Sequence, residues 1–374
     1  MQLQPAFFLK VRQVLIITIA WIIANIIVEL NNSINYDPET RTYFFHFIFG
    51  KNAFQHLLIT AIGPLAGGLF AGSFIVFYQR EKVKGRSYRE KLFIHSSLYI
   101  FYLMVFIGGV GILGALNNTA DAPFWVKFRE DVFSLRVLRL IFTWYFIVVM
   151  TVFFLDVNEK YGAGILRGLL LGKYHKPGKE ERVFMFLDLK GSTTIAEQIG
   201  DEKYFSMLRY FYQVANEAII NTYGEIYQYV GDEIVISWEK KEGIRNANCL
   251  RCFTAIQEAV KKRAGHFTDT YGVVPAFKAG IHAGTVTTGE IGTIKKDIVY
   301  SGDVLNTTAR IVALCNFYKE ELLISGLLYQ ELKETTTEYN FYFIENVLLR
   351  GKKTEMGLWG VRLENALATK TIIS

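Results

Sequence analysis

The sequence predicts a chain in two parts: an α-helical membrane domain with four transmembrane helices, followed by a soluble α+β domain. Two observations predict this division. Of the 374 residues, 51% are hydrophobic and the mean hydropathy is +0.22, but the apolar excess lies in long runs within roughly the first 155 residues. In the remainder, strand-like runs alternate with amphipathic helical patterns. We expect a transmembrane domain over 1–155, a cytosolic connector over 156–180 and a soluble domain over 181–374.

Four apolar runs are long enough to cross a bilayer, which takes about 20 helical residues. They are roughly Val14–Leu30, Leu57–Tyr78, Leu92–Leu116 and Leu135–Leu155. The first run follows Lys10 and Arg12, as the core of a signal peptide would. It is longer than such a core and no small-residue cleavage site follows it, so a transmembrane helix is the preferred interpretation.

The basic residues predict the orientation of these helices. The loop between the second and third runs contains Arg80, Lys82, Lys84, Arg86, Arg89 and Lys91, and the segment after the fourth run is basic again. The loops at 31–52 and 117–134 are close to neutral. The positive-inside rule therefore places both termini in the cytosol, for an integral protein of the inner or plasma membrane. Residues 165–171 of the connector are apolar but too short to span, which predicts a membrane-surface helix.

The cysteines and the net charge exclude other classes of protein. Cys249, Cys252 and Cys315 all lie in the soluble part, so a disulfide framework is not expected. The CLRC pair has no second pair to complete a zinc site, and both thiols are expected to be packing residues. Much of the net charge of +6 flanks apolar runs, so no nucleic-acid partner is predicted.

The soluble part is predicted to alternate strands and helices, in an α+β sandwich of ferredoxin-like type. Gly231–Asp232 joins two of the strands as a tight hairpin. The expected strands are Arg182–Leu187, Glu225–Val230, Glu233–Trp238, Phe277–Ala283, Thr285–Ile291, Glu321–Ile324 and Phe341–Val347. The expected helices are Tyr204–Thr222, Arg245–Ala264 and Val304–Asn316.

Two carboxylates stand where strands end. Asp188 follows the apolar run VFMFL, and Asp232 lies in the hairpin of YVGDEIVISW. Taken singly, each has an ordinary structural explanation, as a helix cap or a turn residue. Together they could hold two divalent ions, because Mg²⁺ favours one or two carboxylates plus triphosphate oxygens. The turn of Gly191, Ser192 and Thr193 offers backbone N–H groups to phosphate at a helix start.

The motifs FLDLKGSTT, YVGDEIVISW, AGIHAGTVTTGEIG and SGDVLNTTAR occur in this order. From about Arg182 to Val361 the chain resembles the catalytic domain of the class III adenylyl/guanylyl cyclases, of the membrane-anchored bacterial type. The resemblance implies a homodimer with active sites at the interface. It also implies two Mg²⁺ or Mn²⁺ ions per site, held by Asp188, Asp232 and the backbone of Leu189. His282 in GIHAG is expected to be a structural residue of a core strand.

The same resemblance assigns residues that reach the active site from the partner subunit. Asn306 would orient the ribose, and Arg310 would stabilise charge that develops on the phosphates. The segment LLRGKKTEMGLW resembles the family's late basic turn, in which Lys352 would meet the triphosphate. Lys353 is an alternative to Lys352.

Two positions differ from the residues that determine, in this family, whether adenine or guanine is bound. The first usually carries Lys in adenylyl and Glu in guanylyl cyclases, and here it is Gln228. The second is often Asp or Thr for adenine and Cys for guanine, and here it is Val299. A glutamine amide can accept from adenine N6–H and donate to N1, but it could also donate to guanine O6. ATP is the preferred substrate, and GTP stays open.

The sequence thus predicts a membrane-bound adenylyl cyclase that converts ATP to 3′,5′-cyclic AMP and pyrophosphate. The ribose 3′-oxygen would attack the α-phosphorus, and two metal ions would assist. The alternatives are a guanylyl cyclase, and a nucleotide-binding membrane sensor with little turnover. The expected partners are ATP or GTP, a second copy of the chain and the lipid bilayer.

Overall fold

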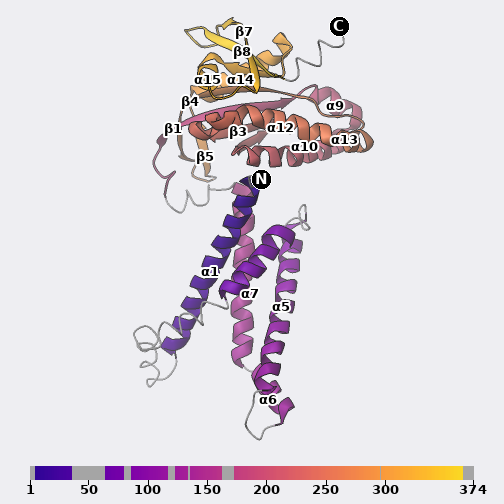
Figure 1. The fold of residues 1–374 in the computed structure, drawn as a ribbon, viewed down its shortest axis with the longest axis vertical. Coiled ribbons are helices and arrows are strands. Elements are labelled where there is room, and N and C mark those ends of the chain that lie inside the picture. Colours follow the sequence, from indigo (N-terminus) through magenta and orange to yellow (C-terminus); the bar gives the residue numbers. More distant parts are fainter. Residues whose placement is uncertain are drawn as a thin grey trace. The chain divides into compact units, whose positions relative to one another are not determined.

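A computed structural model describes residues 5–35, 64–79, 86–116, 123–133, 135–161, 172–294 and 296–364. The chain forms two compact units that divide near Lys160 (Figure 1). The first unit is helical and the second combines a large sheet with helices. Each unit is described by itself below.

The helical unit contains a helix at each of the four predicted apolar runs, as far as these runs are described. Residues 57–63 of the second run and 162–171 of the connector lie outside the described residues. The helices are α1 (Pro5–Asn35), residues 64–73 continued by the π-helix η2 (Phe74–Gln79), α5 (Tyr88–Leu116), α6 (Phe124–Val132) and α7 (Leu135–Tyr161). The short helix α6 was not predicted.

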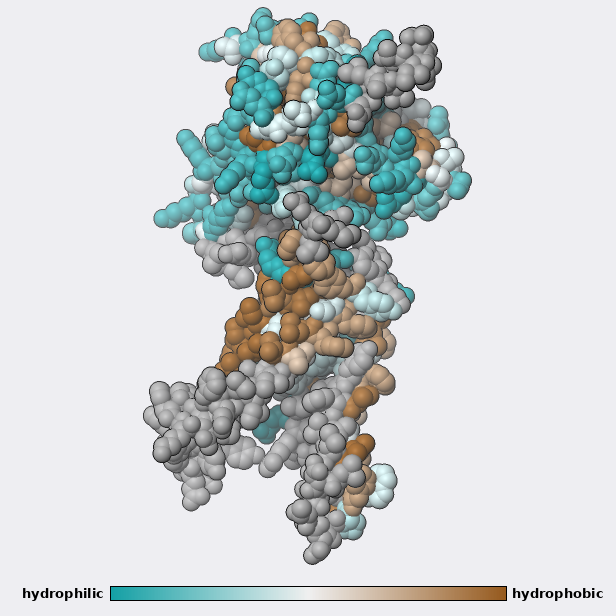
Figure 2. Space-filling model, viewed as in Figure 1, coloured by the Kyte–Doolittle hydropathy of each residue, from teal (hydrophilic) through white to brown (hydrophobic). Residues whose placement is uncertain are grey.

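Two stretches among the described residues are long and apolar enough to cross a membrane. They are Pro5–Val28 and Ile141–Asn158, and Pro64–Tyr78 forms a shorter apolar helix. Large apolar side chains such as Ile16, Ile27 and Phe146 are more than half exposed on the outer surface of this unit. That surface is brown in Figure 2, whereas the sheet-containing unit is mostly teal.

The interior of the helical unit centres on Trp21 of α1, which is buried against Val148 and Val152 of α7. Its Nε1–H group donates to Thr151 Oγ1 at 2.9 Å, and its ring meets Trp144 edge-on at 5.5 Å. These contacts join the first and last helices of the unit.

The second unit is built on one mixed sheet in the order β2-β3-β1-β4-β6-β8-β7, with β5 beside β4. Only β4 and β6 run parallel among the described strand pairs. The strands are β1 (Gly178–Leu189), β2 (Glu225–Val230), β3 (Glu233–Glu239), β4 (Phe277–Ile291), β5 (Asp297–Ser301), β6 (Leu322–Ser325), β7 (Tyr339–Val347) and β8 (Met356–Leu363). The helices are α9 (Ser192–Ile199), α10 (Asp201–Asn221), α11 (Lys240–Ile244), η3 (Arg245–Ala247), α12 (Asn248–Lys262), α13 (Ala264–Tyr271), α14 (Asp303–Tyr318) and α15 (Gly326–Leu332).

The prediction of two strands that meet at Gly284 was wrong. Strand β4 runs unbroken through Gly284, and its second half pairs with β5, which was not predicted. A Cβ atom at Gly284 would lie 2.6 Å from Val304 Cγ2. The glycine is therefore explained by the close approach of α14 to the strand, not by a turn.

The single helix expected over Arg245–Ala264 was also wrong. This stretch comprises η3, α12 and the start of α13, because Asn246 and Ala247 adopt positive φ angles of 52° and 50° that interrupt the helix. Strand β8 and helices α9 and α15 were not predicted.

Side chains of the central strand β1 alternate between the two faces of the sheet. Val183, Met185 and Leu187 pack in the core that includes α10 and α12. Phe184 and Phe186 pack on the opposite face, in a cluster with residues of α14. Figure 1 shows α14 on one side of the sheet, and α10 and α12 on the other. Asp188 continues this second series, so the carboxylate emerges on the α14 face.

Candidate active site

A row of three charged residues crosses the sheet at the end of β1. Asp188 lies opposite Glu233 of β3 and opposite Lys278 of β4 in the strand register. Directly opposed residues emerge on the same face of a sheet. Lys278 Nζ lies 3.2 Å from Asp188 Oδ2, and the lysine is only 7% exposed. One carboxylate oxygen of Asp188 is therefore paired with a largely buried ammonium group.

The second predicted carboxylate belongs to the same cluster. Burial raises the pKa of Asp188 above its ordinary value, Lys278 opposes this shift, and the nearby Asp232 adds to it. Burial together with Asp188 and Asp232 raises the pKa of Glu233 to about 7. Asp188 and Glu233 thus face one lysine, with Asp232 near both, and this excess of acidic groups suits a divalent cation.

The hairpin that carries Asp232 forms as predicted, between β2 and β3. Gly231 has a φ of 61°, the left-handed conformation that such a turn requires. The Tyr212 hydroxyl group donates to the Gly231 carbonyl oxygen at 2.7 Å, and its ring stacks on Tyr229 at 4.5 Å. Helix α10 therefore braces the turn that positions this carboxylate.

The predicted phosphate turn directly follows β1. Gly191 has a φ of 67° and precedes α9, whose first turn has no side-chain cap. Ser192 is partly exposed and Thr193 is exposed at this helix start. The uncapped N–H groups are available to an anion. Leu189 is buried in the opposite core, so only its backbone can take part in the site.

A second cluster gathers at the start of α14 and in the turn between β7 and β8. Asn306 is exposed and Arg310, one helical turn further on, is partly exposed. A Cβ atom on Gly351 would lie 3.5 Å from Arg310 Nη2. The Lys352 ammonium group forms an ion pair with Asp303. Among the described residues, Arg310 therefore lies beside the turn that carries Lys352, and Asn306 lies one helical turn from Arg310 on α14.

The two base positions lie on strands that are not neighbours in the sheet. Gln228 is exposed on β2 and Val299 is partly exposed on β5. Tyr227 precedes Gln228 and Tyr300 follows Val299. A contact between these two tyrosines joins the two strands. Within the described parts of the chain, no hydrogen bond or ion pair links Asp188 or Asp232 to the α14 cluster. The candidate residues thus form two groups, one at the end of β1 and one at α14, which are termed half-sites.

Sequence reasoning missed Lys278, Glu233 and Asp303. A lone lysine at the head of the apolar strand KAGIHAG was a usable signal, because a buried lysine almost always has a charged partner. Asp303 lies in the motif SGDVLNTTAR, but only the fold reveals its ion pair with Lys352. Glu233 follows Asp232 directly, and its role depends on the register with β1.

His282 is a structural residue, as expected. It is buried on β4, and its Nδ1 atom lies 2.7 Å from Ser325 Oγ. Burial, together with the charge of Lys352, lowers its pKa to about 4. Cys249 and Cys252 are buried and unpaired, and burial raises the pKa of each thiol to about 12, which fits packing roles.

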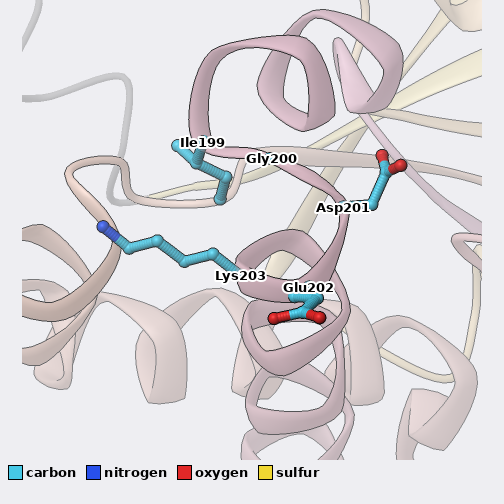
Figure 3. A pocket seen from close by; sticks show the side chains of 5 residues that line it. All are labelled: Ile199, Gly200, Asp201, Glu202 and Lys203. Carbon is cyan, nitrogen blue, oxygen red and sulfur yellow. The ribbon is translucent and has the colours of Figure 1, made fainter.

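A surface hollow at the junction of α9 and α10 contains none of the predicted site residues. It is lined by Ile199, Gly200, Asp201, Glu202 and Lys203, whose side chains point in different directions (Figure 3). Consecutive residues of one bend form it, and no polar groups converge on a common point. A substitution in this hollow, such as one at Asp201, can therefore serve as a control for substitutions of the candidate site residues.

The fold and the two half-sites define a class of enzyme that handles nucleoside triphosphates in an α+β domain. Residues 175–361 match the model of the adenylate and guanylate cyclase catalytic domain. Adenylate cyclase 2 of Rhizobium meliloti (strain 1021) is 33% identical over 286 residues, which cover 71% of this chain and 76% of that protein. The chain belongs to the adenylate and guanylate cyclase family.

More distant proteins agree. Adenylate cyclase 1 of the same organism is 26% identical over 189 residues, covering 49% of this chain and 28% of that protein. The solved structure of a bacterial light-regulated adenylyl cyclase has a TM-score of 0.51 at 17% identity. The match covers 63% of this chain and 67% of the light-regulated cyclase, and it supports the fold alone.

Proposed function

We propose that this chain is a membrane-bound adenylyl cyclase that converts ATP to 3′,5′-cyclic AMP and pyrophosphate as a homodimer. The observation that carries the proposal is the proximity of the Asp188 and Asp232 carboxylates, beside the Gly191 turn, in the fold of a nucleotide cyclase. The 33% identity to a protein named adenylate cyclase 2 favours ATP as the substrate.

The carboxylates fit Mg²⁺ or Mn²⁺, two ions per site. Asp188, Asp232 and the Leu189 carbonyl group would hold them. Mg²⁺ needs only one or two protein carboxylates, because it takes its remaining oxygens from substrate phosphates and water. When bound, the ions would activate the attacking 3′-oxygen and stabilise the leaving pyrophosphate.

The separation of the half-sites supports a two-fold dimer in which each active site uses both protomers. Asp188 and Asp232 of one protomer would face the α14 cluster of its partner. There Asn306 orients the ribose, Arg310 stabilises charge on the phosphates and Lys352 contacts the triphosphate. The turn of Gly191, Ser192 and Thr193 contributes backbone N–H groups to the same phosphates.

The base is read by Gln228 and Val299. The Gln228 amide can accept from adenine N6–H and donate to N1, while Val299 contributes only apolar contact. The same amide can donate to guanine O6, so a guanylyl cyclase is the second candidate function. A nucleotide-binding sensor with little turnover is the third.

The proposed architecture has four transmembrane helices over 1–155, a cytosolic connector over 156–180 and the catalytic domain over 181–374. The two apolar helices of spanning length and the exposed apolar surface of the helical unit support it. The basic residues Arg86, Arg89 and Lys91 at the N-terminal end of α5 support a cytosolic position for this end of the helix. Both termini would then be cytosolic.

The test uses the full-length protein, retained in membranes after alkaline washing and then purified in detergent. It receives ATP or GTP with Mg²⁺ or Mn²⁺, and cyclic nucleotides are quantified. We expect cyclic AMP from the wild type, a loss of at least about 100-fold in Asp188→Asn, and normal activity in the control Asp201→Asn. Cyclic GMP as main product would favour the guanylyl cyclase, and no product from a folded dimer would favour the sensor.

A further inference from the structure

A pair of tyrosines lies directly beside the two base positions. Tyr227 precedes Gln228, and Tyr300 follows Val299. The backbone N–H group of Tyr300 donates to Tyr227 Oη at 3.3 Å, and the two ring centroids are 4.9 Å apart at 62°. Strands β3, β1 and β4 separate β2 from β5 in the sheet. The contact is therefore a tertiary link across the α14 face, and not part of a strand ladder.

Tyr227 lies at a β-bulge of β2. Ile226 pairs with Ile236 and Gln228 pairs with Val235, so Tyr227 is an extra residue on this strand. The Tyr227 ring packs in the cluster on the α14 face, while Gln228 is exposed.

Arg182 and Phe184 of β1 support both rings from the sheet. Phe184 lies 5.5 Å from the Tyr300 ring and 6.4 Å from the Tyr227 ring. The Arg182 guanidinium lies 4.8 Å from the Tyr300 ring centroid and is only 2% exposed. It donates to Ser237 Oγ at 3.0 Å and pairs with Glu225 at the start of β2. A guanidinium held in this way has little freedom, which fixes the ring stacked on it.

We propose that Tyr227, Tyr300 and Arg182 form a clasp that sets the distance between Gln228 and Val299, and thereby determines the selectivity for the base. The inference rests on the proposed function, since it assumes that these two residues face the base. Val299 offers no hydrogen-bonding group, so discrimination depends on the position of one amide. Hydrogen bonds weaken steeply once their geometry is lost, so a displacement of about 1 Å would remove the discrimination.

The deciding variant is Tyr227→Phe, which keeps the ring and removes only the hydroxyl group. We expect the ratio of kcat/KM for ATP over GTP to fall about five-fold, the equivalent of one hydrogen bond. The KM for ATP should change more than kcat, because the clasp positions the base and does not touch the reacting atoms. A second ratio, independent of turnover, is the affinity of the full-length protein for N-methylanthraniloyl-ATP over its affinity for N-methylanthraniloyl-GTP.

The matched control is Tyr223→Phe, an exposed tyrosine two residues before β2. Its hydroxyl group forms no hydrogen bond among the described residues, so both ratios should equal those of the wild type. Equal ratios in a folded Tyr227→Phe variant would overturn the clasp. A wild type that binds both analogues but yields no cyclic nucleotide would overturn the proposed function, while the binding ratio would still decide on the clasp. Binding of neither analogue would overturn both.

Discussion

Individual residues of the site are held by specific polar contacts. Lys278 Nζ lies 3.2 Å from one carboxylate oxygen of Asp188 and holds this side chain at the end of β1. The Tyr212 hydroxyl group fixes the Gly231 carbonyl oxygen, and thereby the turn that presents Asp232. The buried His282 is held on β4 by a contact of 2.7 Å between its Nδ1 atom and Ser325 Oγ, which also accepts the Leu328 N–H group.

His282 leads to a prediction about stability and pH. Its folded pKa of about 4 lies below the ordinary value of 6.5. Between these values the unfolded state binds more protons, so stability is full above about pH 6.5 and falls as the pH decreases towards 4. The loss for this one group is up to about 3 kcal/mol.

The measurement is the melting temperature of the full-length protein between about pH 7.5 and pH 5. His282→Gln removes the titrating group and keeps hydrogen-bonding capacity, so its melting temperature should depend less on pH than that of the wild type. An unchanged pH dependence in the variant would assign the acid sensitivity to groups other than His282.

At the scale of elements, the site depends on how closely α14 lies on β4. A Cβ atom on Gly280 would lie 2.5 Å from the backbone nitrogen of Val312, and one on Gly284 would meet Val304. Glycines on this face of β4 therefore set the distance between the strand and the helix that carries Asn306 and Arg310. Packing at this interface links the stability of the fold to the geometry of the half-site.

Gly280→Ala tests this dependence. The added methyl group meets backbone atoms, so α14 must shift, and we expect a destabilisation of about 1–3 kcal/mol. Cyclase activity should fall more than stability predicts, because Asn306 and Arg310 move with the helix. The control is Gly265→Ala on α13, where an added Cβ atom meets nothing within 4 Å. Alanine should stabilise that helix slightly, and activity there should stay at the wild-type level.

At the scale of the whole molecule, the two half-sites of one chain predict complementation between inactive variants. Asp188→Asn lacks a metal ligand and Arg310→Ala lacks the cationic group of α14. A heterodimer of the two contains one site with both defects and one intact site. Mixing and re-equilibrating equal amounts should therefore restore about a quarter of wild-type activity, since half of the dimers have one working site of two.

The control for complementation mixes Asp188→Asn with Asp232→Asn. Both changes affect the same half-site, so every site in the mixture lacks one metal ligand and no activity should return. Recovery in this control, or none in the first mixture of folded dimers, would contradict active sites shared between protomers.

The sequence by itself determined features that follow from local patterns. The apolar runs predicted the helices of the first unit, because spanning length and hydropathy are properties of a single segment. The apolar run before Asp188 predicted that this residue lies at the end of a strand. Gly231 predicted that Asp232 lies at the tip of a hairpin. Motif order was enough to indicate the family, which the match over residues 175–361 confirms.

The tertiary structure alone decided which distant residues meet. Gly284 is typical of a turn in sequence, yet it lies mid-strand because α14 needs the space. The pairing of Lys278 with Asp188 depends on strand register, and the contact between Tyr227 and Tyr300 joins two strands that are not neighbours in the sheet. Packing and register act between segments far apart in the chain, and local residue patterns do not encode them individually.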